Sequence, residues 1–174
     1  MQLIFFRHGP AGRPDASRWP DDRARPLTPR GEEKTRAAAK GLARTLPATA
    51  RIWTSPRVRA ARTAEFLAAA VGGASPRTIA ALGSGGSARA LMQLLSAETS
   101  DGTIVLVGHE PDLGLLAGSL LSEFTGALPL KKAGACALSF DGPPRLHAGA
   151  LDWFLPPRLL RALGTRKRAG HGAP

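Results

Sequence analysis

The chain has 174 residues, of which 43% are hydrophobic and 21% are charged. This length suits one domain with a substantial core, and the composition is too apolar for a disordered protein. The single cysteine excludes a disulfide framework within the chain and a multi-thiolate metal site. No apolar run approaches the roughly 18 residues of a membrane span, so we expect a cytoplasmic protein. The net charge of +11 fits nucleic-acid binding or attraction of a small polyanion such as phosphate.

In chain order, the first half alternates short apolar runs with amphipathic segments. Residues 3–6 predict a buried strand, and residues 10–26, rich in Pro, Gly, Asp and Arg, predict a loop. Thr28 is a typical N-cap, and the proline after it suits the first position of a helix that is expected to end near Leu46. Residues 51–54 predict a second strand.

The segment after the second strand repeats this signal for a helix start. Ser55, followed by proline, is expected to cap a helix that runs to about Val71. The apolar stripe of this helix is expected to comprise Ala61, Ala64, Leu67, Ala68 and Val71. The opposite side is expected to carry Arg59, Arg62, Thr63 and Phe66.

The second half continues the alternation and ends in an expected hairpin. We predict one domain over residues 1–163 and a basic, disordered tail over residues 164–174. The expected elements are a helix from Ser87 to about Ala97, a strand at 103–107, a helix from Pro111 to about Leu121, hairpin strands at 136–140 and 146–154, and a last helix at 156–163.

Strands that alternate with helices predict an α/β domain with a mostly parallel sheet. In such sheets, ligands bind beyond the carboxyl ends of the strands. His8 and His109 each follow directly on an expected buried strand. We therefore expect both imidazoles to lie on the same rim of the sheet.

The first candidate site is the tripeptide Arg7-His8-Gly9. An imidazole can attack phosphorus and carry the phosphoryl group covalently. Such a group needs cations nearby, because the phosphoryl oxygens stay negatively charged during transfer. Arg7 supplies one cation, and Gly9 lets the backbone turn close to a substrate. A histidine that merely caps a strand, beside a solvated arginine, is the alternative, and three residues alone do not decide.

Two later segments add candidates for anion binding. Residues 55–65 contain Arg57, Arg59 and Arg62, and an arginine in a first helical turn can hold an oxyanion there. His109 lies just before an expected helix start and can donate a hydrogen bond to a transferring phosphoryl oxygen. A solvated basic face and a structural histidine are the alternatives.

Together, these segments resemble the histidine phosphatase superfamily, which includes the phosphoglycerate mutases and acid phosphatases. The resemblance covers residues 1 to about 155, and the small size and the stretch 108–113 are most similar to the short bacterial SixA-like phosphohistidine phosphatases. It implies a phosphoglycerate mutase-like fold, which is a three-layer α/β/α domain with a mostly parallel central sheet and an antiparallel C-terminal hairpin. The matching segments are Arg7-His8-Gly9, Leu27 to Gly31, Ser55 to Glu65, and Gly108-His109.

The resemblance also implies roles for individual residues. His8 would be the nucleophile that becomes phosphohistidine, Arg7 and Arg59 would bind the phosphoryl oxygens, and His109 would stabilise the transition state. Arg57 would be a surface or secondary charge, and so would Arg62. No cofactor and no metal would be required.

One departure from the family concerns the proton donor. Many members carry a carboxylate general acid after the second helix, but this chain has no Asp or Glu between Glu65 and Glu98, and the expected position falls near Ala81. Glu110 is a candidate donor, and a helix cap is its alternative role. Weaker candidates are Asp15 and Asp112.

The missing acid bears on the substrate. An alkoxide leaving group needs a proton, since water-type hydroxyls have a pKa near 16, whereas histidine leaves as an imidazole whose conjugate acid has a pKa of about 6.5. We therefore expect a phosphatase that dephosphorylates phosphohistidine on a phosphotransfer protein. A phosphatase of small phosphate esters with the same mechanism is the alternative, and a basic nucleic-acid-binding module is a distant one.

Overall fold

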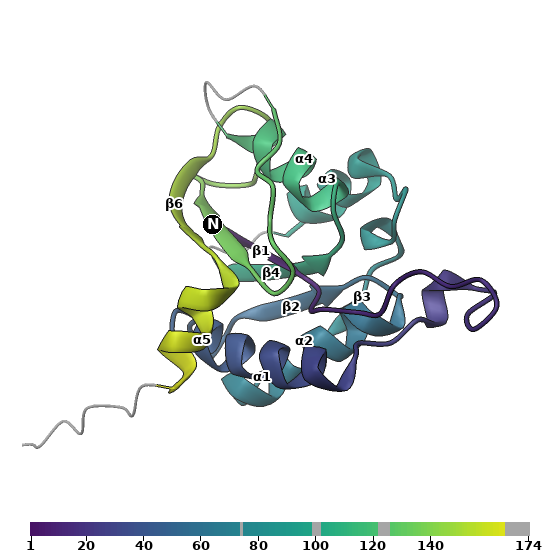
Figure 1. Cartoon of the computed structure of the whole chain (residues 1–174). Helices are drawn as coiled ribbons and strands as arrows, with labels where there is room; N and C mark the ends of the chain where they lie inside the picture. The colour runs from purple at the N-terminus through teal and green to yellow at the C-terminus, as the bar shows by residue number, and fades with distance from the viewer. Residues whose placement is uncertain (74, 99–101, 122–125, 166–174) are drawn as a thin grey trace, which may run out of the picture.

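The apolar runs of the chain form one β-sheet, and the amphipathic segments form helices on its two faces (Figure 1). The computed structural model describes residues 1–73, 75–98, 102–121 and 126–165. The strands are β1 (Gln2–Arg7), β2 (Arg51–Thr54), β3 (Arg77–Thr78), β4 (Thr103–Gly108), β5 (Ala135–Ser139) and β6 (Ala150–Leu155). The α-helices are α1 (Pro29–Ala43), α2 (Val58–Val71), α3 (Ala88–Ser96), α4 (Asp112–Leu120) and α5 (Pro157–Thr165), and two short 3-10 helices are η1 (Asp22–Ala24) and η2 (Ala80–Leu82).

The sheet has the order β3-β2-β4-β1-β5-β6. Strands β3, β2, β4 and β1 are parallel, while β5 and β6 pair antiparallel to their neighbours. Helices α1, α2 and α5 cover one face, and α3 and α4 cover the other (Figure 1). The prediction of a three-layer α/β/α domain with a parallel centre and an antiparallel C-terminal hairpin is confirmed.

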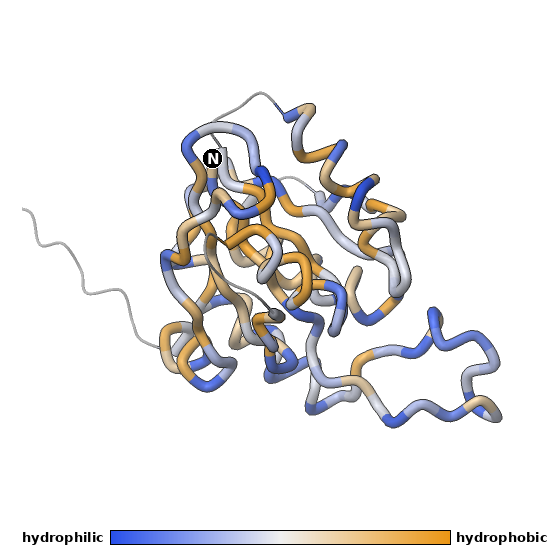
Figure 2. The backbone as a smooth tube through the Cα atoms, turned by 90° about the horizontal axis from the view of Figure 1, so that it is seen from above, coloured by the Kyte–Doolittle hydropathy of each residue, from blue (hydrophilic) through white to orange (hydrophobic). Residues whose placement is uncertain are grey.

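The central strand β1 is buried on both faces, as its uninterrupted apolar sequence predicts. Leu3 and Phe5 face one core cluster, whereas Ile4 and Phe6 face the other, and none of the four is exposed. The alternation follows from the two-residue period of a strand, and each side chain stabilises the fold by about 1.5–3 kcal/mol. Figure 2 shows this hydrophobic centre and a mostly hydrophilic segment, residues 10–26, that projects from it.

Two predicted helix caps are confirmed. The hydroxyl of Thr28 accepts a hydrogen bond from the backbone N–H of Gly31 at the start of α1. The hydroxyl of Ser87 accepts from the N–H of Ala90 at the start of α3. Helix α1 ends at Ala43, a little earlier than expected.

The predicted start of the next helix is wrong. Helix α2 begins at Val58, and its N-cap position is held by Arg57, whose side chain makes no capping bond. Ser55 instead extends the pairing of β2, because its N–H donates to the carbonyl oxygen of Val107 at 2.9 Å. Its hydroxyl oxygen accepts from the N–H of Arg57 at 3.3 Å and also contacts His109, as described below.

The side of α2 opposite its apolar stripe is mostly buried. Arg59 donates to Asp22, the hydroxyl of Thr63 accepts from the N–H of Gly9 at 3.1 Å, and Phe66 packs against Arg36 of α1. The ring of Phe66 lies between two guanidinium groups, those of Arg36 at 4.2 Å and Arg62 at 4.5 Å. These long side chains cover the aromatic ring.

Helix α5 extends to Thr165, two residues into the predicted tail. Residues 166–174, which make up the rest of that basic tail, lie outside the described residues.

None of the helices in the described segments is long and apolar enough to cross a lipid bilayer.

Candidate active site

Three neighbouring parallel strands end at one edge of the sheet, and a polar residue follows each of them. His8 follows β1, Ser55 follows β2 and His109 follows β4. The strand ends are held in register, since the N–H of His8 donates to the carbonyl oxygen of Gly108 at 3.0 Å. The prediction that both histidines lie on the same rim of the sheet is confirmed.

The two imidazoles form a close, buried pair. The ring centroids of His8 and His109 are 4.9 Å apart with an interplanar angle of 53°, and the residues are only 6% and 3% exposed. Burial, together with the smaller effect of the positive charge of Arg59, lowers the pKa of each imidazole to about 3. Both rings are therefore neutral near pH 7.

The orientation of His8 leaves one of its ring nitrogens, Nε2, with a free lone pair. Its Nδ1 lies 2.7 Å from the carbonyl oxygen of Gly9. A carbonyl oxygen can only accept, so Nδ1 carries the hydrogen and Nε2 keeps its lone pair. A neutral imidazole with a free Nε2 lone pair has the properties of a nucleophile.

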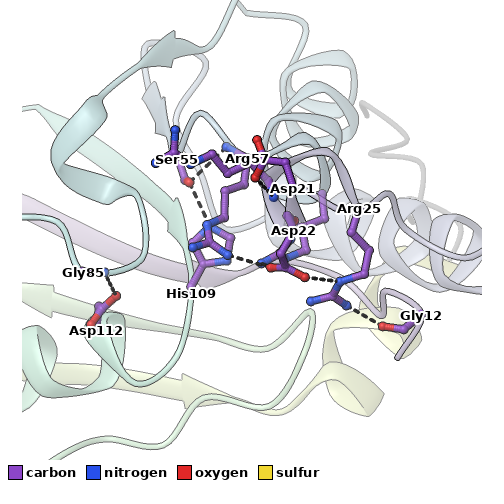
Figure 3. Close-up of polar contacts among 11 residues, drawn as sticks. Gly12, Asp21, Asp22, Arg25, Ser55, Arg57, Gly85, His109 and Asp112 are labelled. Atoms are coloured by element: carbon purple, nitrogen blue, oxygen red, sulfur yellow. Dashed lines mark hydrogen bonds and ion pairs between the residues drawn. The ribbon is translucent and has the colours of Figure 1, made fainter. Parts of the chain in front are cut away.

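His109 is oriented by Ser55, a residue that sequence reasoning used only as a helix cap. The Nε2 atom of His109 lies 2.8 Å from the hydroxyl oxygen of Ser55, and both residues are buried (Figure 3). The Nδ1 atom of His109 is buried and has no hydrogen-bond partner. When the Ser55 hydroxyl donates to Nε2, Nδ1 bears the hydrogen and remains available as a donor.

Two arginines have similarly unpaired nitrogens. Nη1 of Arg7 donates to the carbonyl oxygen of Leu130 at 2.7 Å, whereas its Nε has no partner. Arg59 donates through both Nη atoms to Asp22, and its Nε also lacks a partner. Among the residues described, Arg7, Arg59 and His109 carry all three buried side-chain nitrogens or oxygens that have no partner.

The carboxylate of Asp22 binds three arginines around the site (Figure 3). Its carboxylate accepts from Arg25 at 2.6 Å, from Arg57 at 2.8 Å and from Arg59 at 2.9 Å. The hydrogen bond from Arg25, followed by the charge of Arg59, lowers the pKa of Asp22 to about 2. The sequence predicts a loop here and assigns no role to Asp22, although a carboxylate within an arginine-rich loop is a signal for such a contact.

The other two arginines of the 55–65 segment contribute differently. Arg57 is a secondary charge that donates to Asp22 at 2.8 Å and whose positive charge contributes to the lowered pKa of His109. Arg62 lies on the surface and pairs with Glu32 at 3.0 Å and Glu65 at 2.9 Å.

These groups surround a cavity of about 310 Å³. Most of its charged lining is basic, and Glu110 is the single carboxylate that lines it within the described segments. No cluster of three or more His, Cys, Asp or Glu side chains suited to a metal ion occurs in the part of the chain that the structure describes. The lining residues are Arg7, His8, Ala11, Gly12, Arg13, Pro14, Arg25, Arg59, Ser84, His109, Glu110 and Lys132.

Glu110 lies at the cavity and does not cap a helix. Pro111 holds the N-cap position of α4, and Oε1 of Glu110 instead accepts from the N–H of Leu130 at 3.1 Å. Burial raises the pKa of Glu110 above its ordinary value.

The other acid candidates lie elsewhere. Asp15 is exposed and accepts from Ser17, and Asp112 accepts from the N–H of Gly85 at 3.2 Å (Figure 3). Ala81 lines a second, apolar cavity of about 510 Å³, which has His109 in common with the first.

Comparison with known proteins agrees with this geometry. Residues 3–83 match the family model "Histidine phosphatase superfamily (branch 1)". An uncharacterized protein from Picosynechococcus sp. is 41% identical over 151 residues, which cover 85% of this chain and 90% of that protein.

Solved structures also match. The protein histidine phosphatase SixA complexed with tungstate superposes with a TM-score of 0.77 at 23% identity, over 92% of this chain and 99% of that one. The putative phosphohistidine phosphatase SixA from Nakamurella multipartitia has a TM-score of 0.68 at 25% identity, over 88% and 94% of the two chains. This chain therefore belongs to the histidine phosphatase superfamily and is a phosphatase.

Proposed function

We propose that this phosphatase removes the phosphoryl group from phosphohistidine on a phosphotransfer protein, through a covalent phospho-His8 intermediate and without a metal ion. One observation carries the proposal. The three buried nitrogens that lack partners, on Arg7, Arg59 and His109, belong to residues that line one cavity together with His8. A buried N–H donor without a partner destabilises the folded protein, and an anion that accepts hydrogen bonds from these donors removes that penalty.

In the first step, Nε2 of His8 attacks the phosphorus atom of the substrate. A bond forms between Nε2 and phosphorus while the bond from phosphorus to the substrate's imidazole nitrogen breaks, and that nitrogen keeps the electron pair. The other ring nitrogen of the substrate carries a proton, so the substrate leaves as neutral imidazole and the positive charge passes to the phosphorylated ring of His8. Arg7, Arg59 and Nδ1–H of His109 donate hydrogen bonds to the phosphoryl oxygens, whose negative charge persists through the transfer. The hydrogen bond from Nδ1 of His8 to Gly9 holds the attacking ring in place.

In the second step, water attacks the phosphorus atom of phospho-His8. The bond between Nε2 and phosphorus breaks, inorganic phosphate leaves, and His8 returns to the neutral form that its low pKa favours. The same donors serve both steps, because the phosphoryl group changes partners without leaving the cavity.

The choice of phosphohistidine rests on the leaving group. Residues 66–97 supply no carboxylate to the cavity, because that stretch contains neither Asp nor Glu. An alkoxide would leave slowly without a donor, since a positioned acid contributes about 10²–10⁴ in rate. The imidazole of phosphohistidine leaves with far less help, because its conjugate acid has a pKa of about 6.5.

The test compares kcat/KM for a phosphohistidine-bearing phosphotransfer protein with kcat/KM for sugar phosphates. We expect the phosphoprotein to be the better substrate and His8→Ala to lose activity on both. Faster hydrolysis of the sugar phosphates would assign the site to small esters and overturn the preference for phosphohistidine. Activity that survives in His8→Ala would overturn the covalent route.

A further inference from the structure

We propose that Lys132 and Arg13 form a second anion subsite in the phosphoryl cavity, which binds a carboxylate that the substrate carries near its phosphoryl group. The inference rests on the proposed function, because it takes the end of the cavity at His8 as the place of the phosphoryl group. The subsite makes the enzyme more specific for substrates that carry a second anionic group beside the phosphoryl group.

The first support is an excess of positive charge. Five cations line the cavity against one carboxylate, that of Glu110. Arg25 and Arg59 are bound by Asp22, which lies outside the lining, and Arg7 donates to the carbonyl oxygen of Leu130. The two remaining cations are Arg13 and Lys132.

Arg13 and Lys132 have no hydrogen bond or ion pair with any residue that the structure describes. The charge of the Lys132 ammonium is also opposed by its neighbours. Partial burial lowers the pKa of Lys132, and the positive charges of Arg7, Arg25 and Arg59 lower it further. A second anion at this place would relieve the repulsion, since opposite charges favour each other's ionised forms.

The second support is the fixed position of the backbone beside Lys132. The N–H of the next residue, Ala133, lies 3.1 Å from the carbonyl oxygen of Arg7 and 3.2 Å from that of His8. Ala133 is buried and has a φ of 58°, a left-handed conformation that a non-glycine residue adopts only when its surroundings impose it. The backbone that carries Lys132 is thus attached directly to the segment that carries the nucleophile.

The third support is space. The cavity has a volume of about 310 Å³. A phosphoryl group contributes only one phosphorus and three oxygen atoms. The rest of the cavity can hold the part of the substrate that carries the second anion.

Two matched compounds test the subsite. N-acetyl-phosphohistidine has a free carboxylate, whereas its methylamide has the same scissile bond and no carboxylate. For the wild-type enzyme we expect kcat/KM to be about twofold to fivefold higher for the carboxylate, mainly through KM, as expected for a partly exposed ion pair. Lys132→Met removes this preference, and Arg13→Gln weakens it. Lys131→Met retains it, because Lys131 is exposed and does not line the cavity.

A second arm identifies the source of the carboxylate. Two phosphohistidine peptides differ only in Asp or Asn beside the phosphorylated residue. A Lys132-dependent preference for the Asp peptide assigns the subsite to an acidic side chain of a phosphoprotein. A preference confined to N-acetyl-phosphohistidine assigns it to the carboxylate of a small substrate.

Two results would overturn the inference, and they differ in kind. If the wild-type enzyme hydrolysed charged and uncharged compounds equally, or if Lys132→Met kept the preference, the second subsite would be wrong and the proposed function would stand. If the wild-type enzyme hydrolysed none of the phosphohistidine compounds, the proposed function itself would be wrong, and the subsite with it.

Discussion

The hydroxyl oxygen of Ser55 lies 2.8 Å from Nε2 of His109, at the ends of two neighbouring parallel strands. This contact occupies Nε2, whereas Nδ1 has no hydrogen-bond partner, so Nδ1 is the ring nitrogen available to a ligand. A buried hydrogen bond of this kind fixes both the orientation of a histidine and the nitrogen that carries its hydrogen.

The first prediction concerns this bond. Ser55→Ala should lower kcat about tenfold, because loss of a buried hydrogen bond costs roughly 1–1.5 kcal/mol. KM should change less, because Arg7 and Arg59 still bind the phosphoryl group. Nitrogen NMR of His109 should show a mixture of tautomers in Ser55→Ala and a single tautomer in wild type and in Ser55→Thr, which keeps the hydroxyl. Unchanged kcat and an unchanged His109 spectrum in a folded Ser55→Ala would show that the bond does not position the ring.

The second prediction concerns stability at acidic pH. Each of His8 and His109 has a pKa of about 3 in the folded chain, against about 6.5 when unfolded. Between these pH values the unfolded chain binds more protons, so the free energy of unfolding falls as the pH is lowered from about 6.5 towards 3. When the pH falls from 7 to 5, we expect each histidine to lower the free energy of unfolding by on the order of 1–2 kcal/mol.

Urea unfolding at the two pH values measures this effect. His8→Gln should show a smaller loss than wild type, because glutamine does not titrate. His147→Gln, at an exposed position, should behave as wild type. Equal pH dependence in wild type and His8→Gln would mean that His8 is not held neutral by burial.

The third prediction concerns Gly9, which packs against α1. A Cβ atom at this position would lie 1.7 Å from Oγ1 of Thr35, a buried side chain that donates to the carbonyl oxygen of Gly31 at 2.6 Å. Gly9→Ala should therefore destabilise the fold by about 1–3 kcal/mol and displace His8. Gly73→Ala is the control, because a Cβ there would lie 3.6 Å from Cγ1 of Val71, an ordinary van der Waals contact.

Adding Thr35→Ala to Gly9→Ala should recover part of the loss by removing the clashing hydroxyl. Thermal unfolding of the four proteins decides this point. A Gly9→Ala protein as stable as wild type would mean that β1 and α1 are not held as closely as the structure has them.

The fourth prediction concerns Glu110. Its raised pKa, caused by burial, allows it to keep a proton at a higher pH than an ordinary glutamate. If Glu110 supplies the proton to the leaving group, Glu110→Gln should lower kcat for an alkyl phosphate by about 10²-fold. It should change kcat for phosphohistidine by less than about threefold, since imidazole needs no donor. Glutamine keeps the acceptor for the N–H of Leu130, so the local fold is preserved. Equal losses on both substrates would exclude Glu110 as the proton donor.

The proximity of His8 and His109 could be predicted from the sequence, because one simple rule gives the position of both residues. Each follows a buried strand, and parallel strands bring their carboxyl ends to one rim. The buried runs were equally clear, since β1 and β4 are apolar at nearly every position. The mostly parallel sheet and the histidine pair could therefore be predicted from local patterns, whereas the strand order could not.

The errors come from contacts that no local pattern contains. Ser55 has the sequence of a helix cap, yet its hydroxyl is used by a histidine more than fifty positions away. Phe66 lies on the expected polar side of its helix and is buried under two arginines from different helices. Asp22 begins the short helix η1, and two of the three arginines that it binds, Arg57 and Arg59, come from a segment more than thirty positions away. Each depends on the tertiary packing of distant segments.

Trapping of the phosphorylated enzyme tests the covalent route most directly. Labelled phosphohistidine substrate is mixed with the enzyme, the reaction is stopped within milliseconds, and the position of the label is determined by mass spectrometry. We predict acid-labile phosphate on His8 in wild type and none in His8→Ala, with His147→Gln labelled as wild type. Intact turnover with no phosphate on His8 at any time point would contradict the covalent route.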